Sequence, residues 1–279
     1  MKQVTKESIM MISIILSTFN RPKALNIILE CLCQQTDNNF EIIIADDGSD
    51  IRTKNTINIV KNKYPEQSII HVWQENKGFR LARIRNLAVK AARGDYLIFL
   101  DGDCIPPPDF IKRHRRLSEE GWAVFGQRIL ASKFFTESIE NQPNFFLQKK
   151  VWNTLYFLEA FTKKHINRFA PVLTIPGQFW RKYSSKQWNK IRGCNWAMWK
   201  KDYCAINGSD ESFEGWGAED KDVAVRLLNY GIYLKDGRNY SFVLHLWHPF
   251  ESRKNSESNF SIVRNRLDNH IIHPTKGLN

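Results

Sequence analysis

The sequence predicts an α/β protein built on a doubly wound, mostly parallel sheet. Three observations lead to this prediction. Short apolar runs rich in β-branched residues alternate with segments of helical periodicity through the first hundred residues. These runs contain few polar residues, which is typical of strands that are buried on both faces of a parallel sheet. Polar clusters follow the runs, at the position where open α/β sheets bind their ligands.

Four strands and three helices alternate in this first half. The first apolar run stops at a polar turn, and Pro22 stands where a helix would begin. The second run, FEIIIA, ends at an Asp-Asp-Gly-Ser turn. Right-handed crossovers through the helices would place the strands side by side and parallel. We expect strands at Ile12–Ser17, Phe40–Ala45, Ile69–Trp73 and Tyr96–Leu100, and helices at Ala24–Gln34, 51–63 and Phe79–Arg93.

The composition is that of a folded, basic protein. The chain has 279 residues, 42% hydrophobic and 13% aromatic, which is enough for a buried core and excludes a disordered or fibrous protein. Its length suits one large domain, or one domain with an insertion. The net charge of +12 favours an anionic partner: nucleic acid, an acidic membrane surface or a phosphorylated substrate.

Cysteine usage and hydropathy indicate a cytoplasmic protein. The five cysteines are an odd number without a CxxC pair or zinc-ribbon spacing, so we expect reduced thiols. No uncharged apolar stretch reaches the roughly 18 residues that a transmembrane helix needs. No small-residue cleavage site follows the first apolar run, which argues against a signal peptide.

Residues 145–192 differ from the rest of the chain in charge and aromatic content. They carry ten Lys and Arg against one acid, Glu159, together with eleven aromatic residues. Four apolar residues in this stretch recur at helical spacing with lysines nearby. The pattern predicts a basic amphipathic helix followed by a loop-rich insertion, a surface that suits an anionic membrane. The four residues are Leu147, Val151, Leu155 and Leu158.

Ordered patterns return after this insertion and end in a polar tail that gives little information. An apolar run comes first, then a helical pattern that opens on a cluster of acids, then two short apolar runs. We expect a strand at Cys194–Trp199, a helix at Glu219–Tyr230, and strands at Ile232–Leu234 and Phe242–Trp247.

Pairs of aspartates follow two of the predicted strands. Asp101 and Asp103, with a glycine between them, come directly after the fourth strand. Carboxylate oxygens so placed can hold one Mg²⁺ or Mn²⁺ and leave coordination positions for phosphate oxygens. Asp46 and Asp47 end the second strand, where a carboxylate can accept hydrogen bonds from a base or a ribose. The alternative for both pairs is an ordinary acidic turn.

Other candidate residues carry positive charge or an aromatic ring. Arg80 and Arg83 lie one turn apart on the third helix and could approach a diphosphate, or form a solvated basic face. The segment FEGWGAEDKD, residues 213–222, places two glycines around a tryptophan before a helix that opens with carboxylates. Acids in a first helical turn commonly serve the helix dipole. The Gly-Trp-Gly before them indicates a loop that approaches a ligand closely.

Two histidines close the last predicted strand. Imidazole is a competent Mn²⁺ ligand, so a histidine here could complete a site begun by Asp103, although a lone histidine is usually structural. His245 and His248 are three residues apart, and such residues face opposite sides of a strand. We therefore expect only one of them to bind metal, unless the strand ends between them.

In this order the motifs resemble the inverting GT-A glycosyltransferases of family 2. The runs SIILSTFNRP, IIIADDGSD, NKGFRLARIRN and LIFLDGDC are similar to the nucleotide-sugar-binding half of that family. The segments RGCNWAMWKKD, FEGWGAEDKD and HLWH are similar to the C-terminal part of β-1,4-galactosyltransferases, polypeptide GalNAc-transferases and bacterial chondroitin-type polymerases. The resemblance covers residues 10–130 and 190–250. It implies a GT-A fold with a Rossmann-like nucleotide-binding half, into which the aromatic-basic segment is inserted.

The resemblance also implies how one catalytic domain over residues 1–279 would be divided. A nucleotide-sugar-binding half would come first, followed by a variable insertion for acceptor or membrane contact, an acceptor and catalytic segment, and a C-terminal tail. These parts would span residues 10–130, 131–192, 193–250 and 251–279.

Roles for individual residues follow from the same resemblance. Asp220 would be the catalytic base, and Trp216, Gly217 and Glu219 would contact the sugar or the acceptor. Lys221 departs from the family, because many relatives have an acid there. The donor nucleotide would be held by Thr18, Asn20, Arg21, Asp46, Asp47, Arg80, Arg83 and Asp101.

The implied cofactor is Mn²⁺ or Mg²⁺. Asp103 would be its carboxylate ligand, and His248 resembles the histidine ligand of the family. His245 is the other candidate, at a position that is methionine in the galactosyltransferases.

The implied reaction moves a sugar from a nucleotide donor, by the habits of the family a UDP-sugar, to a saccharide or a lipid-linked saccharide hydroxyl. Attack from the opposite face by a deprotonated hydroxyl inverts the anomeric centre. We expect a role in bacterial surface polysaccharide or lipopolysaccharide synthesis. Residues 145–192 would contact the anionic cytoplasmic face of the inner membrane.

Two other functions fit parts of the sequence. A nucleic-acid-binding module would use the aromatic-basic segment, but no RNP, KH or zinc-finger pattern is present, so we expect no nucleic-acid partner. A sugar-phosphate nucleotidyltransferase shares the sheet and the acid-bound metal, but no glycine-rich, lysine-containing phosphate loop follows the first strand. The donor sugar, the acceptor, the linkage and the oligomeric state do not follow from the sequence.

Overall fold

The protein has a seven-stranded central sheet in the order β3-β2-β1-β4-β8-β6-β9. The structure, a computed structural model, describes residues 10–148, 151–175, 177, 179–182, 186–213, 215, 217–249 and 256–279. β3, β2, β1 and β4 run parallel, β8 is antiparallel to both of its neighbours, and β6 and β9 are parallel to each other. The strands are β1 (Ile12–Thr18), β2 (Phe40–Asp46), β3 (Ile69–Trp73), β4 (Tyr96–Asp101), β6 (Trp122–Phe125), β8 (Asn195–Trp199) and β9 (Tyr233–Asp236).

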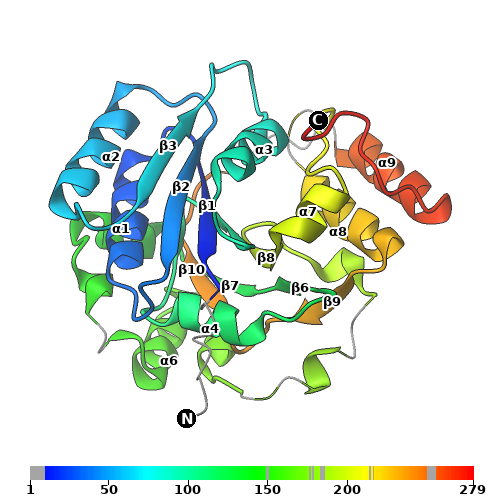
Figure 1. The fold of residues 1–279 in the computed structure, drawn as a ribbon. Coiled ribbons are helices and arrows are strands. Elements are labelled where there is room, and N and C mark those ends of the chain that lie inside the picture. Colours follow the sequence, from blue (N-terminus) through cyan, green and yellow to red (C-terminus); the bar gives the residue numbers. More distant parts are fainter. Residues whose placement is uncertain are drawn as a thin grey trace, which may run out of the picture.

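Helices cover both faces of this sheet. Figure 1 shows α1 (Pro22–Cys33) and α2 (Ile51–Lys63) on one side, and α3 (Leu81–Ala91), α7 (Lys200–Ala205) and α8 (Glu219–Tyr230) on the other. Successive side chains of a strand point to opposite faces, so each buried strand fills two cores. Ile14 belongs to the core under α1, and Ile15 to the core under α3. Each fully buried isoleucine contributes about 1.5–3 kcal/mol of hydrophobic stabilisation.

A second, three-stranded sheet joins distant parts of the chain beside the end of β4. Its order is β5-β10-β7, with β10 antiparallel to β5 and parallel to β7. In this pairing His245 lies opposite Cys104, and the backbone N–H of Leu246 donates to the carbonyl of Asp103 at 2.8 Å. The sheet therefore carries the C-terminal HLWH segment to the aspartates that follow β4. The strands are β5 (Cys104–Ile105), β7 (Gln127–Leu130) and β10 (Phe242–His245).

The alternation predicted for the first half is confirmed, with boundaries that differ by a few residues. The first four strands and first three helices all form. The third helix begins at Leu81 rather than at Phe79, because Arg80 has non-helical backbone angles and acts as the N-cap residue. The last predicted strand ends at His245 rather than at Trp247. Two elements between β5 and β7 had no distinct signal in the sequence, namely α4 (Phe110–Leu117) and β6.

The helix predicted through residues 147–158 is wrong in its extent. Asn153 caps a helix that begins only at Thr154, and its side chain accepts a hydrogen bond from the backbone N–H of Tyr156 at 3.0 Å. Leu147 lies in a separate 3₁₀ turn. No helix in the described ranges is long and apolar enough to cross a membrane. The helical elements of this stretch are α5 (Lys133–Asn141), η1 (Phe145–Leu147), α6 (Thr154–Thr162), η3 (Ala170–Val172), η4 (Phe179–Lys182) and η5 (Trp188–Lys190).

The polar tail contains a further helix, α9 (Ser256–Asp268), which packs on α8 (Figure 1). Val263 of α9 is buried beside Val225 of α8. Asn259 donates a hydrogen bond to the carbonyl of Gly217 at 2.9 Å. The tail thus holds the loop that precedes α8, the helix whose first turn carries the predicted Glu219 and Asp220.

Candidate active site

Three side chains converge at Asp103, in the turn between β4 and β5. His245 Nε2 lies 3.6 Å from one carboxylate oxygen of Asp103, and His248 Nε2 lies 3.4 Å from the other. Both histidines reach the same carboxylate because β10 ends at His245, so that His248 no longer follows the alternation of a strand. Arg21 completes the cluster, with Nη1 3.0 Å from Asp103 Oδ2.

The electrostatics of this cluster suit a hard or borderline divalent cation. Burial would raise the pKa of Asp103, but neighbouring positive charges outweigh it and the pKa lies below its usual range. Burial lowers the pKa of His245, which favours the neutral imidazole that a metal requires. Cys104 lies near both, but burial raises the pKa of its thiol well above the usual value. The ligands that this cluster offers are therefore one carboxylate and two imidazoles, and this set suits Mn²⁺ better than a set containing a thiolate would.

Arg85 connects Asp101 with the C-terminal segment and is almost fully buried. Its Nη2 donates to Asp101 Oδ1 at 3.0 Å and to the carbonyl of Gly193 at 3.2 Å, and its Nε donates to Ser17 Oγ at 3.2 Å. Burial raises the pKa of Asp101 to about 6, and the charge of Arg85 opposes that rise. Sequence reasoning did not select Arg85 as a site residue. The available signal was its place beside Ile84 on the apolar face of α3.

Glu219 and Asp220 lie in the first turn of α8, where Glu219 is within reach of the charge of Arg85. Burial raises the pKa of Glu219 to about 7, the charge of Asp220 adds to the rise, and that of Arg85 opposes it. Asp220 packs against Gly193, where an added Cβ would lie 2.9 Å from the Cβ of Asp220. Only glycine permits this approach.

The loop before α8 has the backbone conformation that its glycines allow. Gly217 has φ of +112°. Ala218, the N-cap residue of α8, has φ of +73°, which costs a non-glycine residue free energy and is typical of functional sites. Trp216, predicted to contact sugar, lies outside the described residues.

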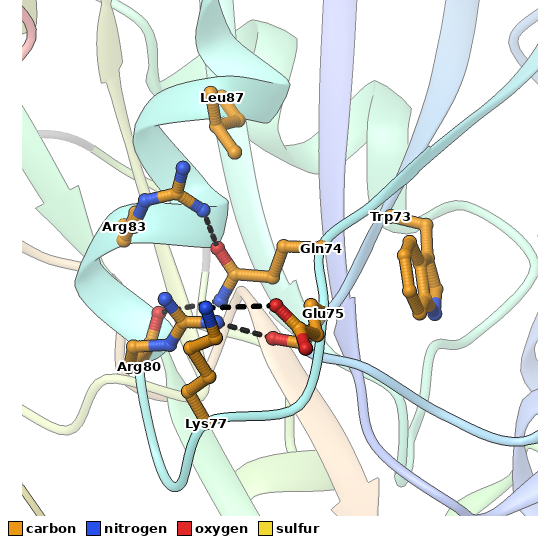
Figure 2. Close-up of a pocket in the computed structure, with 7 residues that line it drawn as sticks. All are labelled: Trp73, Gln74, Glu75, Lys77, Arg80, Arg83 and Leu87. Atoms are coloured by element: carbon orange, nitrogen blue, oxygen red, sulfur yellow. Dashed lines mark hydrogen bonds and ion pairs between the residues drawn. The ribbon is translucent and has the colours of Figure 1, made fainter.

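Arg80 and Arg83, two of the predicted nucleotide residues, line a cavity of about 260 Å³ at the end of β3 (Figure 2). Asp47 lies beside it and accepts hydrogen bonds from the side chain of Gln74 and from the backbone N–H of Arg80, at 2.8 Å for the latter. Arg83 Nη1 donates to Gln74 Oε1 at 2.5 Å. Gln74 thus links the aspartate to the arginine, a role that had no sequence signal. The lining residues are Trp73, Gln74, Glu75, Lys77, Arg80, Arg83 and Leu87.

Asp46 is 1% exposed and satisfied within the protein. Its carboxylate accepts from the backbone N–H of Ser49 at 2.8 Å and pairs with His71 Nε2 at 2.9 Å. Burial raises the pKa of Asp47, and its hydrogen bonds oppose the rise. Of the two aspartates, Asp47 is the one that binds residues of the cavity lining in Figure 2, namely Gln74 and Arg80.

The turn after β1 joins this region to the Asp103 cluster. Asn20 has φ of +48°, and its side-chain oxygen accepts from the backbone N–H of Asp50 at 2.9 Å. Thr18 Oγ1 is buried and has no hydrogen-bond partner among the described residues. Thr18, Asn20 and Arg21 thus lie between the two clusters, although Arg21 pairs with Asp103 rather than lining the cavity.

Residues 13–174 match glycosyl transferase family 2, and residues 179–248 match the N-terminal domain of galactosyltransferase. The chain belongs to glycosyl transferase family 2. The first match covers more than half of the chain, so this membership holds for the fold and for glycosyl transfer as the class of reaction. The enzyme is a glycosyltransferase, and the resemblance inferred from its motifs is confirmed.

Curated relatives include enzymes of polysaccharide synthesis. The chain is 31% identical over 237 residues to chondroitin synthase of Escherichia coli, which covers 80% of this chain and 33% of that protein. It is 30% identical to hyaluronan synthase of Pasteurella multocida, covering 80% and 23%. It is 25% identical to validoxylamine A glucosyltransferase of Streptomyces hygroscopicus, covering 80% and 52%. The chain thus spans a third or less of the length of the chondroitin and hyaluronan synthases it matches.

Solved structures show the same fold at low sequence identity. The S. aureus protein TarS in complex with UDP superposes with a TM-score of 0.63 at 14% identity, over 96% of this chain and 68% of that one. A mannosyltransferase of Pyrobaculum calidifontis in complex with GDP-Man and Mn²⁺ gives 0.59 at 14% identity, over 93% and 62%. The GT-A fold predicted from the motifs is therefore confirmed.

Proposed function

We propose that the enzyme transfers a sugar from a nucleotide sugar to a saccharide hydroxyl with inversion and with the help of a divalent cation. The observation that carries this proposal is the convergence of four separate segments on one place. Asp103 follows β4, His245 ends β10, Arg85 comes from α3 and Asp220 opens α8. Asp103 with the histidines would hold a cation for the leaving diphosphate, and Asp220 would serve the acceptor hydroxyl.

The donor nucleotide would lie along the carboxyl ends of β3, β2, β1 and β4, as ligands of open α/β sheets do. The cavity beside Asp47 suits the base, because a carboxylate held by Gln74 can accept from a base N–H. Arg80 and Arg83 line the same cavity and supply positive charge for the nucleotide. A UDP donor is supported by the structure of TarS in complex with UDP, whereas the Pyrobaculum mannosyltransferase is in complex with GDP-Man.

Asp103, His245 and His248 would hold the cation, with Asp101 nearer the ribose or the donor sugar. A divalent cation there supplies positive charge that stabilises the leaving diphosphate. Arg21 already places its guanidinium on Asp103 at 3.0 Å. Arg21 therefore neutralises this carboxylate in the absence of donor and can turn to a phosphate when the donor is bound.

Asp220 would remove the proton of the acceptor hydroxyl as that oxygen attacks the anomeric carbon. Glu219, beside it, would donate or accept hydrogen bonds to the sugar. A single displacement from the face opposite the diphosphate inverts the anomeric centre, so an α-linked donor gives a β-linked product. General-base catalysis of this kind typically contributes 10²–10⁴-fold in rate.

The biological setting proposed is bacterial surface polysaccharide or lipopolysaccharide synthesis, with a saccharide or lipid-linked saccharide as acceptor. The names of the curated relatives support polysaccharide synthesis. Peripheral contact with the cytoplasmic face of the inner membrane is supported by α6, where Leu155 is 77% exposed and Phe161 is 41% exposed. Lys163 and Lys164 follow directly and are exposed. Exposed apolar side chains next to lysines suit an acidic lipid surface.

A donor-hydrolysis screen tests the proposed reaction. The protein is incubated with UDP- and GDP-sugars, with Mn²⁺, Mg²⁺ or EDTA, and released nucleotide is measured. We expect release from one donor class, faster with Mn²⁺ than with Mg²⁺, and none with EDTA. Equal release with and without EDTA would contradict the metal requirement, and an α-configured product would contradict inversion.

A further inference from the structure

A second cavity, of about 490 Å³, lies at the other end of the central sheet from the nucleotide pocket. Residues of β7, β9 and the segment 187–192 enclose it. The nucleotide cavity borders β3, the first strand in the sheet order, whereas this cavity borders β6 and β9, the last two. Asp101, at the end of β4, lies between them in that order. Two binding regions thus approach the proposed reaction centre from opposite sides.

The described lining of this second cavity is strongly basic. Four cationic side chains, namely those of Arg128, Arg168, Lys190 and Arg192, make no ion pair with a carboxylate among the residues that the structure describes. The other charged side chains of the lining form ion pairs. Asp236 pairs with Arg238 at 2.5 Å, and the ammonium of Lys235 is bound to Glu119.

Two segments that line this cavity also contact the residues of the proposed reaction centre. Arg128 lies on β7, the strand that pairs with β10, and Leu130 of β7 is opposite His245. Arg192 precedes Gly193, whose Cα approaches the side chain of Asp220 and whose carbonyl accepts from Arg85. The lining of the cavity therefore adjoins, through Leu130 and Arg192, the segments that hold His245 and that contact Asp220.

We propose that this cavity binds a carboxylate or a phosphate carried by the acceptor, so that the enzyme extends an anionic saccharide. Four cations around one hollow repel each other and lose water when a ligand enters, and an anion offsets both costs. The arrangement leaves the acceptor hydroxyl near Asp220. The inference rests on the proposed function and names the chemical class of its acceptor.

Surface solvation is the ordinary explanation of a basic patch, and it accounts poorly for this one. Some exposed cations elsewhere pair with acids, such as Arg52 with Asp50, whereas Lys54 and Arg264 make no ion pair among the described residues. What distinguishes this cavity is that four such cations line one hollow. The cations of the cavity have only one acid among their lining neighbours, and that acid is already paired. A uniform positive field in a concave site also raises the local concentration of an anionic substrate.

Acceptor kinetics with a charge-matched control test the inference. The acceptors are a disaccharide ending in a uronic acid, a glycerol-phosphate-substituted disaccharide and the corresponding neutral disaccharide. The double variant Lys190→Gln with Arg192→Gln is compared with Lys54→Gln with Arg264→Gln, which removes two exposed charges on α2 and α9. Both variants have the same net charge, so a difference between them is local.

We expect the wild-type enzyme to prefer one of the anionic acceptors over the neutral one. In the cavity variant the KM for that acceptor rises about 10- to 100-fold, the loss expected for charged hydrogen bonds, and the KM for the neutral acceptor does not. The better anionic acceptor identifies carboxylate or phosphate as the bound group. Equal use of the neutral and anionic acceptors by the wild type, or an equal rise in both KM values, overturns the inference.

Calorimetric titration of the same three disaccharides separates this inference from the proposed function. If the wild type releases no nucleotide from any donor, the proposed function fails. The inference then depends on binding alone: tighter binding of an anionic disaccharide that is lost in the cavity variant and kept in the control variant supports it. Binding that does not distinguish charge overturns it.

Discussion

Glu219 and Asp220 are adjacent in the chain, yet the start of α8 places their carboxyl groups in different surroundings. Glu219 is buried close to Asp101 and Arg85, and its Oε2 has no hydrogen-bond partner among the described residues. Asp220 lies against Gly193 and accepts a hydrogen bond from the backbone N–H of Lys221 at 2.8 Å. The raised pKa of Glu219 leaves part of its population protonated at neutral pH, so its carboxyl group can donate as well as accept hydrogen bonds, the role proposed for it beside the sugar.

The first prediction concerns Asp220. Asp220→Asn keeps the shape of the side chain and removes its basicity, so turnover falls about 10²–10⁴-fold while nucleotide affinity is kept. Steady-state transfer rates and nucleotide titration measure the two quantities. Asp268→Asn, at an exposed position of α9, is the control and leaves turnover unchanged. A loss of less than about tenfold shows that another group is the base.

The second prediction concerns Glu219 and pH. Its pKa rises from 4.5 to about 7 on folding, so the unfolded chain ionises first and the folded state loses stability as pH rises between those values. The full loss is about 3 kcal/mol in free energy of unfolding. Glu219→Gln removes this dependence and is therefore stabilising relative to wild type at pH 8, with little difference at pH 4.

Urea unfolding of the metal-free protein at both pH values measures this difference. Glu257→Gln, an exposed substitution on α9, serves as the control and shows no such pH dependence. An identical effect of Glu219→Gln at pH 4 and pH 8 would show that the carboxyl ionises as readily in the folded as in the unfolded state.

At the level of elements, α9 fixes the start of α8 through a buried ionic network. Arg266 of α9 donates to both Asp222 of α8 and Asp210, and Arg226 donates to the same Asp222 at 2.8 Å. Burial would raise the pKa of Asp210, but the hydrogen bonds of Arg266 and of the Ser212 backbone lower it to about 2. Since Asp222 is two residues from Asp220, this network positions the first turn of α8, which carries the proposed base.

The third prediction follows from this network. Arg266→Met leaves Asp210 and one oxygen of Asp222 buried without their partner, so the free energy of unfolding falls by about 3–5 kcal/mol. Chemical unfolding measures it. Arg264→Met changes an exposed arginine of the same helix and costs less than about 0.5 kcal/mol. Equal stability of the two variants would show that the network contributes nothing to the packing of α9.

At the level of the whole molecule, positive charge and exposed apolar side chains collect in the insertion. Leu155, Leu158 and Phe161 of α6 are exposed, as is Phe134 of α5. The amphipathic pattern of this stretch therefore turns part of its apolar side outward, whereas Phe157 and Ala160 face the core. A surface of this kind can enter the headgroup region of a bilayer while lysines contact acidic lipids.

The fourth prediction tests that contact. The protein co-sediments with vesicles containing acidic phosphatidylglycerol and not with phosphatidylcholine vesicles, and added salt weakens the binding because it screens the charges. Leu155→Ser with Phe161→Ser reduces it. Ile59→Ser, which removes an exposed isoleucine of α2, does not. Equal binding to neutral and acidic vesicles argues against the electrostatic part of the contact.

Local patterns were sufficient to predict the parallel half of the fold and most candidate residues. Buried parallel strands appear in a sequence as uninterrupted apolar runs, and the turns at their carboxyl ends carry polar residues. Asp47, Asp101 and Asp103 could therefore be placed at the carboxyl edge of the sheet. The small sheet of β5, β10 and β7 could not be predicted. It joins segments more than a hundred residues apart, and two of its strands are only four residues long.

Arg85, Gln74 and α9 show the same limit for the site. The place of Arg85 on the apolar face of α3 indicates burial, but nothing in a single sequence identifies Asp101 as its partner. The sequence of α9 is polar because the buried side of this helix consists largely of Arg266 and Asn259. These two side chains can be buried because they donate hydrogen bonds to Asp210, Asp222 and the carbonyl of Gly217.

The amino-acid order alone determined the class of fold, the family and the side chains proposed to carry the chemistry, because those follow from local periodicity and short motifs. Tertiary structure decided that both histidines reach one aspartate, since β10 ends between them. It also decided that cations of β7 and of the 187–192 segment, which have no carboxylate partner among the described residues, line one cavity. That segment leads into Gly193, which contacts Asp220. These contacts depend on the pairing of strands that are far apart in the sequence, and no local sequence pattern encodes that pairing.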